Sequence, residues 1–487
     1  VQHAGSGHPG TAMALAPVAH LIYNRHLRHD PTDPHWAGRD RFVLSCGHAS
    51  ILQYVQLHLT GYDVTLDDLQ HFRRLGSRTP GHPEYGHTAG VETTTGPLGQ
   101  GVATAVGMAM GFIHERALYD PDAPTGTSPF DRDVWVICSD GDLQEGVSAE
   151  AAALAGHHQL GNLVVVYDDN DIQIAGAASL AQSEDVAARF RAQRWHVQTV
   201  DLLPDGDVDA DALDDALARA AADTTAPNLV IVRSQIAWPA PTARGTAASH
   251  GAPLGPAEVE ATRALLAPGS AAFDVPASVL VSAQCAAEKG ARLHREWDEA
   301  YADWARRHPS AAELYERAQA RKVPNGLRTV TPVWAAGQRV ATRDASGTVI
   351  QKLAAELSEL WGGSADLAEP NRTTIQAGGS FLPRSRDGRN VHWGVREHAM
   401  AAAMNGILLA GATRFFVGTF LTFSDYQRPA IRLAALMQLP AIYLYSHDSV
   451  ALGADGPTHQ PIEHLASLRA MPGLAVVRPA DANEAAV

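Results

Sequence analysis

Side chains with oxygen donors follow two apolar segments of the sequence. Ser139-Asp140-Gly141 comes directly after the apolar run 134–138, and Asp168-Asp169-Asn170-Asp171-Ile172 comes directly after the run 163–167. Near-continuous apolar runs are typical of buried parallel strands, and ligands bind beyond the carboxyl ends of such strands. A carboxylate, an amide oxygen and free backbone carbonyls at one sheet edge are ligands suited to Mg²⁺.

Two interpretations of these polar residues stay open at this level. Asp and Asn are common helix caps and turn residues at strand ends, and for either residue alone that role is the better prediction. The pairing of Asp140-Gly141 after one strand with Asn170 after the next favours a metal and phosphate site. Gly141 would let the backbone approach a phosphate, and the helix that follows would point its amino end at the anion.

Glu397 is a candidate for acid–base chemistry. Val395, Ala399 and Met400 around it are apolar or small, and apolar surroundings raise the pKa of a carboxyl group. Such a group could keep its proton near neutral pH and share it with a ring nitrogen of a ligand. The alternative is that Arg396-Glu397-His398 is a charged cluster on the surface.

Three aromatic residues could form the wall of a binding site for a flat heterocycle. They are Phe420, Phe423 and Tyr426, and aromatic faces favour stacking on such a ligand. The alternative is that they form the core-facing stripe of a helix.

The order of expected elements predicts an α/β fold with parallel sheets flanked by helices. Strands are expected at 134–138, 163–167, 229–232, 414–417, 441–445 and 474–477, with helices at 102–118, 147–160, 340–360 and 401–409. Glu, Arg and Ala dominate residues 256–325, which we interpret as a helical connector. The expected domains are therefore 1–255, the connector 256–325, and 326–487.

Composition excludes several classes of protein. The 487 residues hold 38 basic and 53 acidic side chains, a net charge of −15, which argues against a nucleic-acid partner. No apolar run approaches the length of a membrane span, so no membrane partner is expected. The three cysteines form no CxxC pair, and a cytoplasmic location is the expectation.

Motifs along nearly the whole chain resemble the transketolase family, whose enzymes depend on thiamine diphosphate. Asp140-Gly141 with Asn170 resembles the metal and diphosphate motif of thiamine diphosphate enzymes, with Ser139 where a glycine is usual. The other motifs occur in the family's order: Ser6-Gly-His-Pro-Gly10, Cys46-Gly-His-Ala-Ser50, Thr79-Pro-Gly-His-Pro83, Thr95-Gly-Pro-Leu-Gly-Gln-Gly101, Ser249-His-Gly-Ala-Pro253, Gly363-Ser-Ala-Asp-Leu367, Gly394-Val-Arg-Glu-His-Ala-Met400 and Asp455-Gly-Pro-Thr-His-Gln460.

The resemblance implies two thiamine diphosphate-binding-fold domains and a set of cofactor ligands. The metal, Mg²⁺ or Ca²⁺ or Mn²⁺ in its place, would be bound by Asp140, Asn170 and the Ile172 carbonyl. Cofactor-binding residues would be His48, Gly96, Pro97, Leu98, Gly141, Asn170, His250, Asp366, Phe420, Phe423 and Tyr426.

The resemblance also implies the reaction and its residues. A two-carbon ketol unit would pass reversibly from a ketose phosphate to an aldose phosphate through a cofactor adduct, as in the pentose phosphate pathway. Glu397 would protonate the aminopyrimidine ring, and His8, His250 and His459 would assist as catalytic residues. Substrate-binding residues would be His8, His82, His250, Arg343, His447, Asp455 and His459. The family forms homodimers with active sites at the subunit interface.

Some positions depart from the family pattern. Pro370 stands where a phosphate-binding serine is usual, with the acidic Glu369 beside it, and proline has neither a hydroxyl nor an N–H. Ala454 stands before Asp455 where an acid is common. A further arginine of the family pattern and a C-terminal domain fall beyond Val487, and part of the N-terminus falls before Val1, so the sequence is expected to be most of an enzyme.

Other functions remain as alternatives at this stage. The first is a related synthase, of the dihydroxyacetone or 1-deoxyxylulose-phosphate synthase type. The second is an inactive fragment that binds the cofactor. The preferred donor and acceptor sugars do not follow from the sequence.

Overall fold

The computed structural model describes residues 1–487, which divide into two compact units. Unit 1 comprises residues Val1–Val106 and Arg132–Tyr301, and unit 2 comprises Gly107–Asp131 and Ala302–Val487. The α/β fold predicted from the sequence is confirmed, because each unit is built around a parallel sheet. The expected domain boundaries at 255 and 325 stay a prediction.

The sheet of unit 1 has five parallel strands in the order β1-β2-β3-β7-β6. The strands are β1 (Arg41–Leu44), β2 (Val134–Ser139), β3 (Leu163–Asp169), β6 (His196–Val200) and β7 (Asn228–Arg233). A short antiparallel hairpin, β4 (Ile172–Gln173) with β5 (Gly176–Ala177), follows β3. Strands β2 and β3 are almost wholly buried, as their apolar sequences require.

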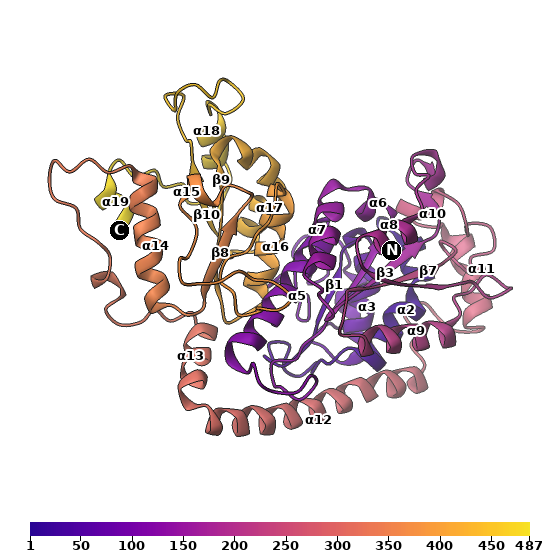
Figure 1. The fold of residues 1–487 in the computed structure, drawn as a ribbon. Coiled ribbons are helices and arrows are strands. Elements are labelled where there is room, and N and C mark those ends of the chain that lie inside the picture. The colour runs from indigo at the N-terminus through magenta and orange to yellow at the C-terminus, as the bar shows by residue number, and fades with distance from the viewer. The chain divides into compact units, whose positions relative to one another are not determined.

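The helices of the first part of the chain connect these strands (Figure 1). They are α1 (Pro9–Ala14), α2 (Ala16–Leu21), a π-helix (Ile22–His26), α3 (Ser50–Thr60), α4 (Leu66–Gln70), α5 (Gln100–Tyr119), α6 (Asp140–Gln144), α7 (Gly146–His157), α8 (Val186–Ala192), α9 (Ala210–Ala222) and α10 (Ala248–Gly251), with 3₁₀ turns at Gly47–Ala49 and Ala178–Leu180. The segment 256–325 holds α11 (Pro256–Leu266), α12 (Ala277–Arg307) and α13 (Pro309–Gln319).

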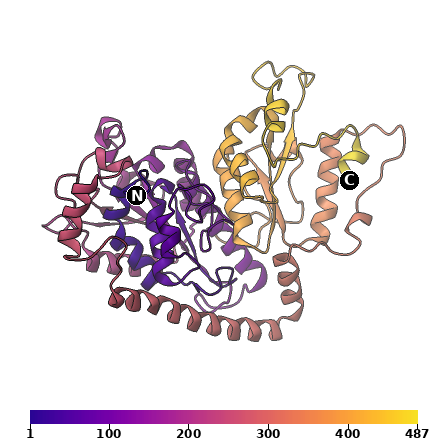
Figure 2. The ribbon, with the colours of Figure 1, turned by 180° about the vertical axis from the view of Figure 1, so that it is seen from behind.

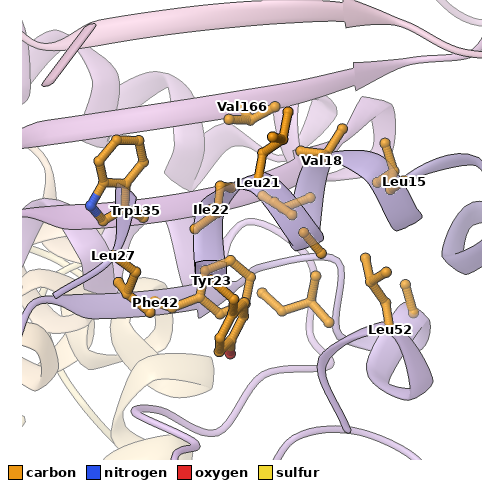
Figure 3. Packing of buried hydrophobic residues seen from close by; sticks show 14 of the residues in the cluster. Leu15, Val18, Leu21, Ile22, Tyr23, Leu27, Phe42, Leu52, Trp135 and Val166 are labelled. Carbon is orange, nitrogen blue, oxygen red and sulfur yellow. The ribbon is translucent and has the colours of Figure 1, made fainter. Parts of the chain in front are cut away.

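One face of the unit 1 sheet carries a hydrophobic core. Alternate residues of β1 and β2, Phe42 and Trp135 among them, face the helical segment that contains Leu21, Ile22 and Tyr23 (Figure 3). This alternation follows from the two-residue period of a strand, and it leaves the carboxyl ends of the strands free for polar loops.

Unit 2 contains a three-stranded parallel sheet in the order β10-β9-β8. Its strands are β8 (Leu360–Ser364), β9 (Arg414–Phe420) and β10 (Ile442–Ser446). Its other elements are α14 (Thr342–Glu356), α15 (Ala368–Asn371), α16 (Glu397–Ala410), α17 (Ser424–Leu436), α18 (His464–Arg469), α19 (Ala482–Ala486) and 3₁₀ turns at Leu327–Thr329 and Leu421–Phe423. Helices α16 and α17 cover one face of the sheet, and α14 lies on the other (Figures 1 and 2).

Two expectations about elements in unit 2 are wrong. Residues 474–477 form no strand, and Val477 is 83% exposed, because the segment does not pair with the edge strand β10. The helix expected at 340–360 ends at Glu356, because Leu360 enters β8. None of the helices combines the length and the apolar character that crossing a membrane requires.

Candidate functional site

The predicted oxygen-rich edge of unit 1 lies where the sequence placed it. Strands β2 and β3 are parallel neighbours in which Ser139 pairs with Asp168, so the residues that follow them share one sheet edge. Asp140 begins α6 and is 4% exposed, and the Tyr167 hydroxyl donates a hydrogen bond to its carboxylate.

Asp140 is one of several acidic groups at this edge. Burial raises the pKa of Asp140 to about 6, with Asp169 and Asp171 adding to the rise and the bond from Tyr167 opposing it. Asp140, Asp169 and Asp171 also line a cavity of about 380 Å³. Several carboxylates in one partly buried place are stabilised by a cation, and hard oxygen donors fit Mg²⁺.

Asn170 is oriented by its own short-range contacts. Its Nδ2 donates to Asp168 Oδ2 at 2.6 Å, and its Oδ1 accepts from the Ile172 backbone N–H at 2.8 Å. This turn fixes the side-chain oxygen beside the backbone of Ile172, which begins the β4 strand. The Asn170 amide oxygen and the Ile172 carbonyl follow the strand next to that of Asp140, and with its carboxylate they are the kinds of donor that a divalent cation takes.

Asp142 is a residue of this edge that sequence reasoning missed. It is fully buried, and its Oδ1 accepts hydrogen bonds from Ser45 Oγ at 2.6 Å and from the Gly99 N–H at 2.8 Å. Its Oδ2 accepts from the Ser139 N–H at 3.0 Å, the pattern of a capping box. The capping pattern Ser-x-x-Asp is readable in the sequence, whereas the contacts to Ser45 and Gly99 are tertiary.

Three of the predicted histidines form a cluster in unit 1. The ring centroids of His8 and His48 are 5.0 Å apart, those of His8 and His250 5.8 Å, and those of His48 and His250 5.1 Å. Burial, together with the charges of neighbouring groups that include Arg73, lowers the pKa of His8 to about 4 and that of His48 to about 3. Burial also lowers the pKa of His82 and His250. These imidazoles are therefore neutral at physiological pH.

The cluster contains nitrogen atoms that have no hydrogen-bond partner. His48 Nε2 and His250 Nδ1 are buried and unpaired. A buried polar atom without a partner costs free energy that a ligand can recover. Imidazole nitrogens can donate hydrogen bonds to phosphate oxygens, so the cluster fits a diphosphate.

The loop that contains Gly96, Pro97 and Leu98 packs closely on this edge. A Cβ added to Gly141 would lie 2.7 Å from Leu98 Cδ1, and one added to Gly47 would lie 2.8 Å from the Gly96 backbone nitrogen. Gly47 faces backbone, so glycine is required there for the loops to meet, whereas a Cβ at Gly141 would displace the end of the Leu98 side chain. The predicted residues Gly96, Leu98 and Gly141 lie together in unit 1.

Glu397 is the first residue of α16 in unit 2 and is 8% exposed. Burial raises the pKa of its carboxyl group. Ala399 and Met400 are fully buried, as expected, but Val395 is 72% exposed. The residue is therefore a buried carboxyl and not part of an exposed charged cluster.

The predicted aromatic residues lie at the carboxyl end of β9 and do not form a helix stripe. Phe420 ends β9, Phe423 ends the 3₁₀ turn, and Tyr426 is an exposed residue of α17. The Phe420 and Phe423 rings lie 5.9 Å apart and nearly parallel. His459 lies beside them, with its ring centroid 5.3 Å from that of Phe423.

The remaining predicted residues of unit 2 are Arg343, at the start of a helix, and His447, Asp366 and Asp455, in exposed or half-buried loops. Arg343, in the first turn of α14, and His447, directly after β10, both line a cavity of about 850 Å³. Asp366 and Asp455 are exposed. Burial lowers the pKa of His447, and the carboxylate of Asp455 opposes this fall.

Pro370 lies in α15, and its acidic neighbour is paired. Glu369 forms an ion pair of 2.7 Å with Arg372, which also pairs with Asp344 at 2.8 Å. Since both pairs are exposed, they add little stability, but Arg372 balances the charge of Glu369.

Unit 1 thus combines an acidic strand end with buried imidazoles, and unit 2 contains a buried carboxyl group, Glu397, and the aromatic rings of Phe420 and Phe423. These are features of an α/β protein that binds a phosphorylated ligand with an aromatic ring. Residues 1–324 match the family described as "Transketolase, thiamine diphosphate binding domain", and residues 338–487 match "Transketolase, pyrimidine binding domain". The chain belongs to the transketolase family.

Curated relatives and solved structures agree with this assignment. The chain is 51% identical to the transketolases of Mycobacterium bovis and Geobacillus stearothermophilus, covering 100% of this chain and 70% and 72% of those proteins. The structure of the Pichia stipitis transketolase complex with sedoheptulose-7-phosphate has a TM-score of 0.95 and 42% identity, covering 100% of this chain and 72% of that one. The Leishmania mexicana transketolase has a TM-score of 0.95 and 40% identity, with the same coverage.

The chain is thus a thiamine diphosphate-dependent transferase that moves two-carbon ketol units between sugar phosphates. These relatives favour transketolase over the synthase alternatives, since each is itself a transketolase.

Proposed function

We propose that ketol transfer takes place at a site formed by the predicted residues of both units, with a divalent metal at Asp140. The observation that carries this proposal is the pair of unpartnered, buried nitrogens of His48 and His250 in the same unit as the acidic edge. The buried imidazoles lack a hydrogen-bond partner, and the carboxylates at the strand ends lack a cation. A diphosphate with its metal ion would supply both.

Unit 1 would bind the diphosphate end of the cofactor. Asp140, Asn170 and the Ile172 carbonyl would bind Mg²⁺. His48 would donate to a phosphate oxygen, and His250, whose ring hydrogen-bonds to the Ile172 backbone, would contact the phosphates beside it. Leu98, packed against Gly141, would support the cofactor rings from the Gly96–Leu98 loop.

Unit 2 would bind the aminopyrimidine. Phe420 and Phe423 offer parallel aromatic surfaces, and Tyr426 and Asp366 would complete that side. The Glu397 carboxyl, whose pKa burial raises, would hold a proton at its oxygen for the ring nitrogen. When bound, thiamine diphosphate supplies the nucleophilic carbon that carries the ketol unit.

The sugar phosphate would be recognised by groups from both units. His8, His82 and His250 in unit 1 and His459 in unit 2 would donate to, or exchange protons with, hydroxyl and carbonyl oxygens. Asp455 would accept from a hydroxyl group. Arg343 and His447, which line one cavity, would bind the terminal phosphate.

We also propose that the active enzyme is a homodimer. The cofactor would lie between unit 1 of one subunit and unit 2 of the other, and the cytoplasm would be its location. Mg²⁺ would be the resident metal, and Ca²⁺ or Mn²⁺ would substitute.

Removal of metal and cofactor tests the proposal. Purified protein treated with a chelator should lose transfer activity and regain it only when thiamine diphosphate and Mg²⁺ are both added. Thermal shift on the same samples reports binding separately. Full activity after metal removal would contradict the metal assignment, and binding without turnover would indicate the inactive alternative.

A further inference from the structure

A set of polar residues lies at the carboxyl ends of the two outer strands of the unit 2 sheet, β8 and β10. Ser364 ends β8 and Ser446 ends β10, while Asn371 ends α15. Ser364, Asn371 and Thr373 are at most 5% exposed. Buried polar groups of this kind require hydrogen-bond partners, and here they find them in one another.

The inner part of this set is a continuous chain of hydrogen bonds. Thr373 Oγ1 lies 3.5 Å from the Ala368 carbonyl oxygen, and Ser364 Oγ lies 2.8 Å from Thr373 Oγ1. Asn371 Nδ2 lies 3.3 Å from Ser364 Oγ. The Asn371 amide donates from Nδ2 to Ser364 Oγ, and the Ser364 hydroxyl is then free to donate to Thr373.

The outer part of this series of hydrogen bonds ends at a histidine side chain. With its Nδ2 toward Ser364, Asn371 presents Oδ1 to Ser446 Oγ at 2.5 Å. An amide oxygen can only accept, so the Ser446 hydroxyl donates its single hydrogen to Asn371. Ser446 Oγ also lies 2.9 Å from His447 Nδ1, where it can now only accept. His447 must therefore carry a hydrogen on Nδ1.

The opposite orientation of the Asn371 amide fits these hydrogen bonds less well. A reversed Asn371 amide would place Nδ2 against Ser446 and Oδ1 against Ser364. Nδ2 would then lie 2.5 Å from Ser446 Oγ, which is shorter than the N–H···O range of about 2.7–3.2 Å, whereas a hydroxyl that donates to an amide oxygen fits this distance.

The His447 ring is held in place by its backbone and by an aromatic neighbour. Its φ angle is +52°, in the left-handed region, and its ring stacks on Phe420 with centroids 3.7 Å apart. The charged or titratable groups that act on it are Arg343 of α14 and Asp448, Asp455 and His459 of the following loop. Ring orientation and proton position are therefore both set by unit 2.

We propose that Asn371 and Ser446 are positioning residues that fix the proton of neutral His447 on Nδ1, so that His447 binds a substrate phosphate only as the imidazolium. The proposal rests on the assignment of His447 to the terminal phosphate. In the neutral ring, Nε2 presents a lone pair, which a phosphate oxygen cannot use. Binding of the phosphate is thus coupled to uptake of one proton at Nε2.

The electrostatic setting makes this proton uptake measurable. Burial lowers the pKa of His447, Arg343 and His459 lower it further, and Asp455 and Asp448 oppose the fall. The ring is therefore largely neutral near neutral pH before substrate arrives. Affinity for a phosphorylated substrate should then fall as the pH rises, by about tenfold per pH unit above the pKa of His447.

Nuclear magnetic resonance tests the proton position without reference to activity. In nitrogen-15 histidine-labelled holoenzyme, the His447 signals are identified by their loss in His447→Gln. We expect the Nδ1–H tautomer in the wild type, in Ser446→Thr and in Asn371→Asp, which retains an acceptor opposite Ser446. In Ser446→Ala we expect a mixture with Nε2–H. An Nε2–H tautomer in the wild type, or an unchanged tautomer in Ser446→Ala, would overturn the proposal.

Kinetics with two acceptors test the coupling. The KM for a phosphorylated aldose is compared with that for glycolaldehyde, which has no phosphate, across a range of pH. The ratio of the two KM values should rise with pH in the wild type and in Ser446→Thr, and should rise less in Ser446→Ala, whose neutral His447 can donate from Nε2. The ionisation of the substrate phosphate is the same for all variants. A difference between variants in the pH dependence of the KM ratio therefore reports on His447.

The outcomes separate this proposal from the function on which it rests. If His447→Gln changes both KM values equally, His447 does not bind the phosphate, and the functional assignment of that residue fails. If His447→Gln selectively raises the KM of the phosphorylated acceptor but Ser446→Ala keeps the wild-type pH dependence, only the positioning proposal fails.

Discussion

The hydroxyl of Ser45 donates a 2.6 Å hydrogen bond to the carboxylate of Asp142, although the two residues follow different strands, β1 and β2. Both residues are fully buried. The same carboxylate oxygen accepts from the Gly99 N–H, so Asp142 joins two strand ends to the Gly96–Leu98 loop. This residue therefore positions the loops that are expected to surround the cofactor.

Asp142→Asn should destabilise unit 1. The amide replaces one acceptor oxygen with a donor that faces existing donors, and a buried group left unsatisfied costs about 1–3 kcal/mol. Chemical denaturation should show this loss, and the affinity for thiamine diphosphate should fall with it. Asp215→Asn, at an exposed position of α9, is the matched control and should change neither quantity. Equal stability of the two variants would contradict the role of Asp142.

Gly141→Ala should weaken cofactor binding. The new methyl group would lie 2.7 Å from Leu98 Cδ1 and push the Leu98 side chain out of the position that is expected to support the cofactor. Gly146→Ala is the control, because a Cβ at Gly146 would meet nothing within 4 Å. Titration of each variant with thiamine diphosphate and Mg²⁺ should show a rise of at least about tenfold in Kd for Gly141→Ala alone. Similar Kd values for both variants would show that the Leu98 contact does not shape the site.

His48 should make the cofactor-free protein less stable in acid. Burial lowers its pKa from 6.5 to about 3, so at pH values between these the unfolded chain binds a proton that the folded protein does not. Unfolding is then favoured as the pH falls through that window, with a slope of at most about 1.4 kcal/mol per pH unit for one imidazole. His48→Gln cannot bind that proton and should lose stability less steeply. Denaturation curves at several pH values measure both slopes, and parallel slopes would refute the prediction.

Glu397→Gln should remove most of the transfer activity and leave the fold intact. Gln has nearly the same shape but cannot supply the proton, and acid–base groups of this kind contribute roughly a hundredfold to ten-thousandfold in rate. Turnover of a ketose phosphate with an aldose phosphate should fall by that order, while cofactor binding measured by thermal shift should change little. Wild-type turnover in this variant would exclude Glu397 as the acid.

The sequence predicted the features that depend on local pattern. Apolar runs such as 163–167 indicated buried parallel strands, and the polar residues after them, Asp140 and Asn170, follow adjacent strands as expected. For Glu397 the local sequence left a surface cluster and a buried acid open, and the structure shows that the residue is buried. For the strands and the polar residues after them, residues close in sequence determined the outcome.

Features that depend on distant residues could not be predicted in this way. The apolar segment 474–477 has strand-like composition, but a strand requires a pairing partner, and β10 leaves it unpaired. Asp142 and Ser45 carry no signal of their contact, and neither do Asn371 and Ser446. Such polar contacts arise only where the ends of separate strands meet.

Mixing two inactive variants tests the central claim, that each active site combines unit 1 of one subunit with unit 2 of another. Asp140→Asn should disable the metal site and Glu397→Gln the acid, so each homodimer should be inactive. After subunit exchange, a hybrid dimer would hold one site with both defects and one with neither. Transfer activity should therefore recover to about a quarter of the wild-type value, since about half of the dimers are hybrids. No recovery, with hybrid dimers shown to be present, would contradict the shared site.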